Sequence, residues 1–574
     1  MKRLTVLLGG LISIAVLLSS CGGLNKMKKN AGTVQYTVNP NPLEMHADSV
    51  ALSVTGKFPP KYFNKKATLT ITPYLVSKTG NKEVAFKPVT VQGEKVQDNN
   101  KVISYTNGGD FSYKDVIPYD EAYRLSKLEL RITAKKGKKS LDFDPVQIAE
   151  GVIATPGLVR IDPKPIIGKD KFQRITPEEK VAKILFKIQQ ANLQPKELKK
   201  EEVKAVMEYL KEVAENKRKE LKEVDLSAYA SPDGPIDLND RLSKDRGKVT
   251  YKYLKKKFRK EEKLANDSIY KEHFTTEDWE GFKELMEQSN LPDKDLVLRV
   301  LSMYSDPDQR EKEIKNMSKI YTEIAEQILP KLRRTVMKVK VNNIGYSDDE
   351  IKSIYSTKPD SLKPEELLYA ATLYNDLNKK LEIYKKFMEI YPNDWRGPNN
   401  AAAMLILMNK PEDAKTLLDK AKQLNENNPI IENNFGAVCL LKGNIEKAEE
   451  HFKSASGAGK EVNYNLGIVD IKKADYQGAV SAFGSECGFN PALAKLLAED
   501  YDGSIKTADC ASNKEDAMIY YVKAVDGARK GDSDLLFNNL RIAIEKDAKL
   551  KDLAKTDMEF AKYFNDDTFK SIVQ

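Results

Sequence analysis

A recurring pattern of small and large apolar residues constrains this 574-residue chain more than any other feature. Shifting the C-terminal third by 34 residues places small residues over small ones and Leu over Phe, and a further shift of 31 residues repeats part of the pattern. The aligned sets are Ala402, Ala414, Leu418 and Ala421; Gly436, Ala448, Phe452 and Ala455; and Gly467, Ala479 and Phe483. Small residues at helix crossings beside one large residue are what stacked helix pairs require. The sequence therefore predicts an all-α solenoid.

This repeat resembles the tetratricopeptide repeat (TPR), whose small, small and aromatic positions fall at these places. The segments "PEELLYAATLYND" and "YYVKAVDGARKGDSDLLFNNLRIAIEKD" look like degenerate copies on either side, so we expect a TPR solenoid over residues 360–574 with about five or six helix pairs. The resemblance implies a concave groove that holds a peptide or another protein. We therefore expect a protein partner in that groove.

Residues 33–165 show a β pattern. The segments "VALSVTG", "TLTITPYLV" and "LELRITA" alternate apolar with polar residues, are rich in Val, Ile and Thr, and are separated by turn-forming stretches such as "TNGGD". Alternation with one apolar face predicts an antiparallel β-sandwich, which we interpret as an immunoglobulin-like module used as a spacer or docking surface.

Residues 170–345 change to a mixed α and β pattern. The apolar periodicity predicts a strand in "AKILFKIQQANLQP", a helix over Val203–Val213, a strand in "LKEVDLSAYASPDG", a second helix, and a final strand in "LRRTVMKVKV". Between the second helix and the final strand, residues 262–330 are predicted to be a helical insertion. The order is thus strand, helix, strand, helix and, after the insertion, strand.

The turn after the second strand carries the next resemblance. Gly234 is followed by Asn239, Leu242, Ser243 and Arg246, the spacing of the Asn-x-x-Leu-Ser-x-x-Arg helix start in OmpA-like domains, which bind peptidoglycan. The resemblance implies that Arg246 pairs with a diaminopimelate carboxylate, because a guanidinium suits a bidentate contact.

An Asp in that family receives the ligand's ammonium group, and here its position holds Ser231, which brings no charge. Asp233 is the nearest substitute. The candidate peptidoglycan-binding residues are therefore Ser231, Asp233, Asn239 and Arg246. The alternative is that "SPDG" is only a turn and Arg246 a surface helix residue.

The N-terminus has the pattern of a secretory signal. Lys2 and Arg3 precede an apolar run over residues 4–18, which is short for a membrane span, and the run ends in Leu-Ser-Ser-Cys21. This resembles a bacterial lipobox over residues 1–21, with Cys21 as the lipidated residue and residues 22–32 as a flexible tether. The alternative is an ordinary signal with an accidental Cys.

The residues after Cys21 indicate a location. The sequence resembles Bacteroidetes-type outer-membrane lipoproteins, in which acidic residues just after the lipidated Cys direct export to the cell surface. Here the corresponding segment, "GGLNKMKKN", is basic. We therefore expect lipid attachment to the outer membrane, on the periplasmic face.

Charge and cysteine content exclude several classes. The 94 Lys and Arg residues against 85 Asp and Glu give a net charge of +9 without a basic block, so we expect no nucleic-acid partner. The three His residues are far apart and the four Cys form no C-x-x-C pair, so we predict no metal site and no cofactor. Cys487 and Cys510 are predicted to form a disulfide, with buried free thiols as the alternative.

These observations together favour a binding protein. No Ser-His-Asp, Cys-His or paired-carboxylate arrangement can be located, so we predict no enzymatic activity. The leading hypothesis is a periplasmic scaffold whose solenoid recruits a membrane-assembly or secretion machine near the cell wall. The alternatives are a structural lipoprotein that anchors the membrane to peptidoglycan, and a surface-exposed component of an uptake or adhesion system.

Overall fold

The structure is a computed structural model, and it describes residues 22–80 and 82–574. The signal sequence, the lipobox and Cys21 lie outside the described residues. The chain divides into two compact units: unit 1 comprises residues up to Lys169 together with Tyr374–Gln574, and unit 2 comprises Asp170–Leu373. Within the described residues, no helix has the length and apolar character needed to cross a membrane.

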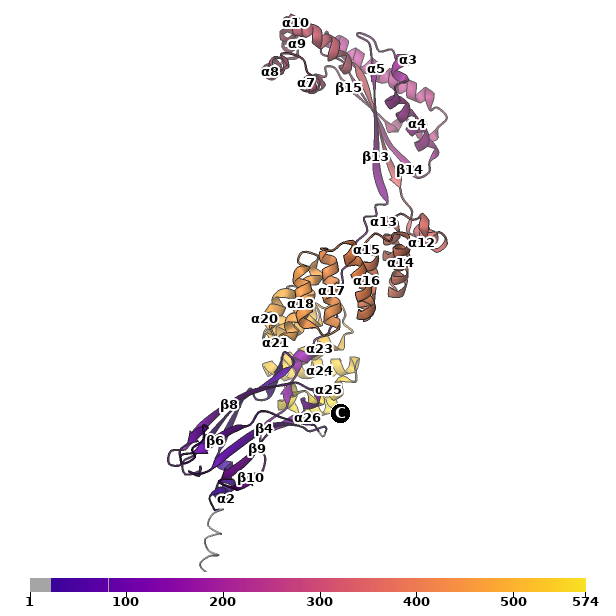
Figure 1. Cartoon of the computed structure of the whole chain (residues 1–574). Helices are drawn as coiled ribbons and strands as arrows, with labels where there is room; N and C mark the ends of the chain where they lie inside the picture. The colour runs from indigo at the N-terminus through magenta and orange to yellow at the C-terminus, as the bar shows by residue number, and fades with distance from the viewer. Residues whose placement is uncertain (1–21, 81) are drawn as a thin grey trace, which may run out of the picture. The chain divides into compact units, whose positions relative to one another are not determined.

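The N-terminal part of unit 1 is a β-sandwich, as the alternation predicts (Figure 1). One sheet contains β1 (Gln35–Asn39), β3 (Ser49–Phe58), β2 (Leu43–His46) and β12 (Val152–Ile153), with β8 (Gly109–Pro118) paired to β3. The other contains β10 (Lys139–Asp142), β9 (Ser126–Lys136), β4 (Thr68–Ser77), β6 (Val89–Gly93) and β7 (Lys101–Ile103), with β11 (Val146–Glu150) on β9 and β5 (Glu83–Ala85) on β4. Alternate residues of β3 and β4 are buried in one shared core.

The segment predicted to be a flexible tether is a helix instead. Helix α2 (Gly22–Lys29) buries Leu24 and Met27 in the core of the sandwich. These two residues are three apart, so they lie on one helix face, and Lys28 at the end of the helix donates to the carbonyl oxygen of Asp142 at 3.1 Å. The glycine and lysine content concealed this short apolar face.

Unit 2 is built on a four-stranded sheet in the order β13 (Ile175–Leu185), β16 (Arg334–Ile344), β14 (Lys219–Tyr229) and β15 (Tyr270–Thr275). Helices α4 (Glu201–Glu215) and α5 (Ile236–Lys257) pack on it, in the predicted order strand, helix, strand, helix, strand. The first strand, however, begins at Ile175 and ends at Leu185, earlier than predicted. The chain continues through α12 (Asp348–Thr357) and α13 (Pro364–Thr372), so unit 2 includes residues assigned to the solenoid by the sequence.

The predicted helical insertion is only partly helical. Its residues 270–275 form β15, which pairs in parallel with β14. Helix α6 (Glu262–Ala265) packs through Leu264 in the core of the sheet, whereas the helices after β15 have a small hydrophobic core of their own around Phe282 and Ile324. They are α7 (Trp279–Gln288), α8 (Lys294–Met303), α9 (Pro307–Asn316), α10 (Ser318–Gln327) and α11 (Leu329–Leu332).

The C-terminal part of unit 1 is a stack of helix pairs, as the repeat predicts (Figure 1). After α14 (Leu377–Ile390) the pairs are α15 (Arg396–Leu407) with α16 (Pro411–Leu424), α17 (Pro429–Leu441) with α18 (Ile445–Ser454), α19 (Lys460–Lys472) with α20 (Tyr476–Phe483), α21 (Phe489–Leu497) with α22 (Tyr501–Asp509), and α23 (Ala517–Lys530) with α24 (Ser533–Lys546). Helices α25 (Leu550–Thr556) and α26 (Asp567–Val573) end the chain.

The small–large pairs found in the sequence lie in contact. A Cβ atom added at Gly436 would lie 2.5 Å from the Phe452 ring, and one at Gly467 would lie 2.7 Å from the Phe483 ring. Each glycine therefore lets the first helix of a pair approach the aromatic ring of the second.

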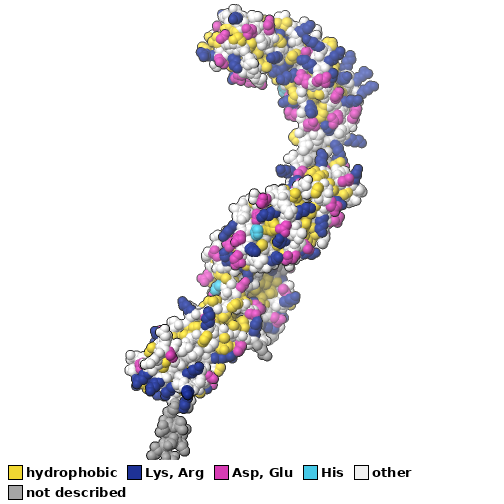
Figure 2. All heavy atoms as spheres, in the orientation of Figure 1, with side chains coloured by type: hydrophobic (Ala, Val, Ile, Leu, Met, Phe, Trp, Pro, Cys, Tyr) yellow, Lys and Arg dark blue, Asp and Glu magenta, His cyan; other side chains and the backbone are white. Residues whose placement is uncertain are grey.

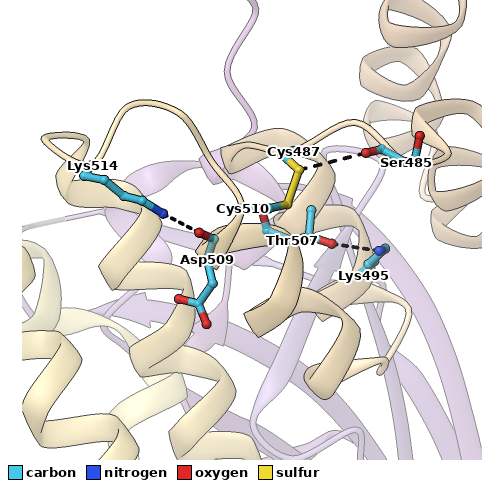
Figure 3. Close-up of a disulfide and its surroundings, with 7 residues drawn as sticks. All are labelled: Ser485, Cys487, Lys495, Thr507, Asp509, Cys510 and Lys514. Carbon is cyan, nitrogen blue, oxygen red and sulfur yellow. Dashed lines mark hydrogen bonds between the residues drawn. A yellow bond between two sulfur atoms is a disulfide. The ribbon is translucent and has the colours of Figure 1, made fainter.

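Cys487 and Cys510 are joined by a disulfide in the structure, with their Cα atoms 5.6 Å apart (Figure 3). Cys487 precedes α21 and Cys510 follows α22, and Lys495 Nζ on α21 also donates to Thr507 Oγ1 on α22 at 2.7 Å. The disulfide thus closes one helix pair.

Reducing this disulfide is expected to lower the free energy of unfolding of unit 1 by about 3 kcal/mol, because the cross-link restricts a loop of about 25 residues in the unfolded chain. Urea unfolding with and without a reductant measures the effect. A Cys439→Ser variant, which changes the half-buried free thiol, should respond to the reductant as the wild type does. Equal stability in both conditions would contradict a stabilising role.

Candidate functional site: a peptide clamp in the solenoid groove

An extended segment of the chain lies along the solenoid. It covers residues 159–169, which we name the strap, and it follows the short 3-10 helix Thr155–Leu158 after the sandwich. The strap contacts the first helices of four consecutive pairs, α15, α17, α19 and α21. The sequence interpretation had placed residues 159–165 at the end of the sandwich and had left residues 166–169 unassigned.

Asparagine side chains hold the strap by its backbone. In each of four contacts, one Asn accepts the N–H of a strap residue through Oδ1 and donates through Nδ2 to the carbonyl oxygen of the same residue, at 2.7–3.0 Å. The pairs are Asn400 with Gly168, Asn434 with Ile166, Asn465 with Lys164, and Asn490 with Arg160. A carboxamide carries the same donor and acceptor as a peptide group, so the contact resembles a β-bridge.

The asparagines are deeply buried and linked to one another. The four that read the strap are at most 2% exposed, and Asn399 and Asn433 connect them. Asn434 Nδ2 donates to Asn399 Oδ1 at 2.9 Å, and Asn465 Nδ2 donates to Asn433 Oδ1 at 3.0 Å. Buried amides require partners, and here the strap backbone supplies them. The solenoid core is thus completed by a segment from outside the solenoid.

Two prolines fix the register of the strap. Pro163 and Pro165 lack an N–H, and both fall between the residues that the asparagines read. A shift of one residue would place a proline opposite an Asn Oδ1 and remove a donor. Proline also restricts the unfolded strap, which lowers the entropy lost on docking.

Three strap residues make contacts that restrict which residue fits at their positions. Ile166 is 8% exposed and belongs to the solenoid core. A Cβ at Gly168 would lie 2.7 Å from Arg396 Cγ and 2.9 Å from the Trp395 ring, so only glycine fits. Arg160 forms a bidentate ion pair with Asp516, with N–O distances of 2.5 and 2.6 Å.

Asp162 is held by the solenoid as well. Tyr464 Oη donates to both of its carboxylate oxygens at 3.0 Å, and Asn490 Nδ2 donates to Oδ1 at 2.9 Å. Burial raises the pKa of Asp162, while the hydrogen bond from Tyr464 opposes that shift.

The sandwich also contacts the solenoid directly. In the 3-10 helix directly after β12, Thr155 Oγ1 donates to a carboxylate oxygen of Glu559, which is paired with Arg529 at 2.6 Å. At a second point Lys472 pairs with Asp48 in the turn between β2 and β3 at 2.7 Å. These contacts and the strap join sandwich and solenoid into one body.

Two buried carboxyl groups in the solenoid make its stability depend on pH. Burial raises the pKa of Asp526, which accepts from Ser504 Oγ at 2.8 Å, to about 7, and burial together with the charge of Glu559 raises the pKa of Asp557 to about 6. The folded chain therefore keeps protons that the unfolded chain, with an Asp pKa of about 3.9, releases. Consequently the free energy of unfolding should fall as pH rises from about 4 to about 7.

Asp526→Asn is expected to flatten this pH dependence and to raise the free energy of unfolding at about pH 8 by about 1–2 kcal/mol, because the amide never ionises. Urea unfolding across about pH 5 to 8 compares the variant with the wild type. An unchanged slope would mean that Asp526 is not a source of the dependence.

The four candidate peptidoglycan-binding residues of unit 2 surround one small cavity. Ser231, Asp233, Asn239 and Arg246 all line a space of about 30 Å³, which is room for about one water molecule. Asn239 Nδ2 donates to the carbonyl oxygen of Gly234 at 2.9 Å and so shapes the turn.

Arg246 donates its hydrogen bonds to backbone carbonyl oxygens of its own unit. It is 1% exposed and donates to the carbonyl oxygens of Tyr229 at 2.9 Å, Gln190 at 3.2 Å and Lys187 at 3.5 Å. Burial, and then the neighbouring charge of Arg333, lowers its pKa to about 10. The alternative in which Arg246 is a surface residue is therefore wrong, and its guanidinium is already bonded.

Asp233 also has an internal partner. Arg333, next to the start of β16, pairs with Asp233 Oδ2 at 2.8 Å and donates to Ser231 Oγ at 3.0 Å. The two residues that the sequence offered to a ligand's ammonium group are thus already bonded to a guanidinium of this chain. The role of Arg333 was not foreseen, because its sequence neighbourhood indicates only a strand.

No family model and no curated protein matches this sequence. Among solved structures, the chain is similar to the APC/C hetero-tetramer Cut9–Hcn1, with 14% identity, a TM-score of 0.33, and coverage of 58% of this chain and 60% of that chain. It is similar to Pseudomonas aeruginosa pilF, with 16% identity, a TM-score of 0.28, and coverage of 36% and 98%. A tetratricopeptide repeat protein from Parabacteroides merdae shows 11% identity, a TM-score of 0.29, and coverage of 43% and 98%.

The described residues define a multidomain protein with a β-rich N-terminal region and a C-terminal helical region that resembles a tetratricopeptide solenoid. The class follows from the helix pairs and their small–large contacts. The groove asparagines were missed, although a signal was present. Asn400, Asn434 and Asn465 recur at the same shifts of 34 and 31 residues as the packing positions.

Proposed function

We propose that this protein is a non-enzymatic scaffold that recruits a protein partner through its solenoid. The observation that carries the proposal is the clamp itself, in which buried asparagines hold an extended peptide by its backbone. Lys and Arg side chains lie among Asp and Glu side chains over both units in Figure 2, which supports a protein partner rather than a polyanion.

We further propose that the protein is a lipoprotein of the outer membrane, lipidated at Cys21 and facing the periplasm, near a membrane-assembly or secretion machine. The lipobox-like sequence and the basic segment after it support this. Cys21→Ala should move the protein from the membrane fraction to the soluble fraction. Protease added to intact cells should leave the wild type uncut, whereas cleavage would favour the surface-exposed alternative.

Site-specific photocrosslinking in cells tests the scaffold. A crosslinking residue at Leu407 or Leu424, which are exposed on the solenoid, should give an adduct of one discrete size. The matched position is Val102, exposed on the sandwich, where no such adduct is expected. Adducts at neither solenoid position, or the same adducts at all three positions, would contradict recruitment through the solenoid.

The second candidate function is attachment to the cell wall through an OmpA-like domain. One observation favours it, because the four candidate residues do meet around one cavity. The size of that cavity and the pairing of Arg333 with Asp233 oppose it. Sedimentation of the full chain with purified peptidoglycan distinguishes the two functions. We expect the amount of protein in the pellet to stay at the background level, whereas saturable binding would favour the wall anchor.

A further inference from the structure

We propose that the strap is an exchangeable ligand, and that the groove binds a partner's extended peptide in its place. This rests on the proposed function and deepens it, since it names the site and the kind of partner. The partner is a peptide whose residues at the positions of Arg160, Lys164, Ile166 and Gly168 each present both an N–H and a carbonyl oxygen to the asparagines.

The clamp sets few sequence requirements. Asn400, Asn434, Asn465 and Asn490 contact only backbone atoms of the residues they read, which any extended peptide without proline at those places provides. Prolines are accepted between the read residues, as Pro163 shows.

The strap side chains refine the ligand class. Asp516 calls for a cation at the position of Arg160, the solenoid core calls for an aliphatic residue at that of Ile166, and the contact with Trp395 calls for glycine at that of Gly168. A matching partner segment has an arginine, then an aliphatic residue six places later and a glycine two places after that.

A cleft beside the strap offers a partner more than the strap uses. It has a volume of about 600 Å³, and the solenoid residues that line it include Leu407, Leu440 and Ile445. Leu407, which stays in the solenoid when the strap leaves, is 50% exposed. An apolar side chain of a partner would bury this surface. That gain offsets the advantage that the strap has from being tethered in the same chain.

Exchange would also change the connection between the units. The strap runs directly into unit 2 at Asp170, so its release turns a fixed segment of about ten residues into a linker.

A peptide-binding experiment on the full chain tests the exchange. The probe is a fluorescent peptide of residues 157–170, and the receptor variant is Ile166→Pro, whose own strap lacks the N–H that Asn434 accepts. We expect the peptide to bind this variant at least about tenfold more tightly than the wild type, by fluorescence anisotropy. A control peptide carrying the same proline should bind neither protein.

Hydrogen exchange on the wild type is the second measurement, and it tests the proposal even if the Ile166→Pro variant does not fold. The amides of Arg160, Lys164, Ile166 and Gly168 should exchange faster than those in the middle of α17 and α19, because the strap opens while the solenoid stays folded. Equal amide exchange rates in the strap and the helices would overturn the proposal. So would a folded Ile166→Pro variant that does not bind the peptide. Discrete adducts at Leu424 would still uphold the scaffold, with its partner on another surface.

Discussion

Replacing Ile166 by proline is expected to lower the free energy of unfolding of unit 1 by about 2–5 kcal/mol. Proline removes the N–H that Asn434 Oδ1 accepts at 2.7 Å in a buried site, which costs about 1–3 kcal/mol. The smaller ring also leaves space where Ile166 packs, which adds a further 1–2 kcal/mol or so. Urea unfolding followed by Trp395 fluorescence in a Trp279→Phe background reports on unit 1, because Trp395 lies beside Gly168.

The matched control is Pro165→Ala, one residue away. No asparagine reads the N–H of residue 165, so the change should cost less than about 1 kcal/mol, mainly through the greater freedom of the unfolded chain. Similar losses for the two variants would mean that the strap is held by its shape and not by the asparagine bonds.

Replacing Arg246 by alanine is expected to lower the free energy of unfolding of unit 2 by about 4 kcal/mol. Three backbone carbonyl groups lose their charged donor and a buried cavity is left, and hydrogen bonds to charged groups contribute about 1.5–3 kcal/mol each. Trp279 fluorescence in a Trp395→Phe background follows unit 2 during urea unfolding.

Arg241→Ala is the control on the same helix, because Arg241 is exposed, and it should change stability by no more than about 0.5 kcal/mol. The contrary outcome is that the wild type sediments with peptidoglycan, whereas Arg246→Ala is as stable as the wild type but does not sediment. Arg246 would then bind a ligand and would not be needed for the fold.

Much of the fold could be predicted because it depends on periodic burial. The alternation in β3 and β4 and the face formed by Val203, Val206 and Leu210 in α4 match the buried positions. The small–large pairs of the solenoid do so as well. The OmpA-like and immunoglobulin-like assignments remain predictions.

The elements that the sequence did not predict have no periodic pattern of apolar residues. In β15 the residues after Tyr270 are largely exposed, so a strand joined to β14 by backbone pairing left no apolar alternation. The strap is an extended segment with two prolines, and its binding is encoded in asparagines more than 200 residues away. At the unit 2 cavity, the sequence grouped the right residues but could not show that Arg333 and backbone carbonyls already satisfy them.

The strap precedes the helices that hold it by a long stretch of chain, and this orders how the protein is completed. Gly168 and Asn400 are 232 residues apart, and Arg160 and Asn490 are 330 apart, with all of unit 2 between them. Such distant pairings form late, because the chain must first close a long loop. A chain that emerges from its N-terminus therefore carries an undocked strap until its last third is made. Any molecule that ends before α15 lacks the means to fix it, so the clamp distinguishes finished chains from unfinished ones.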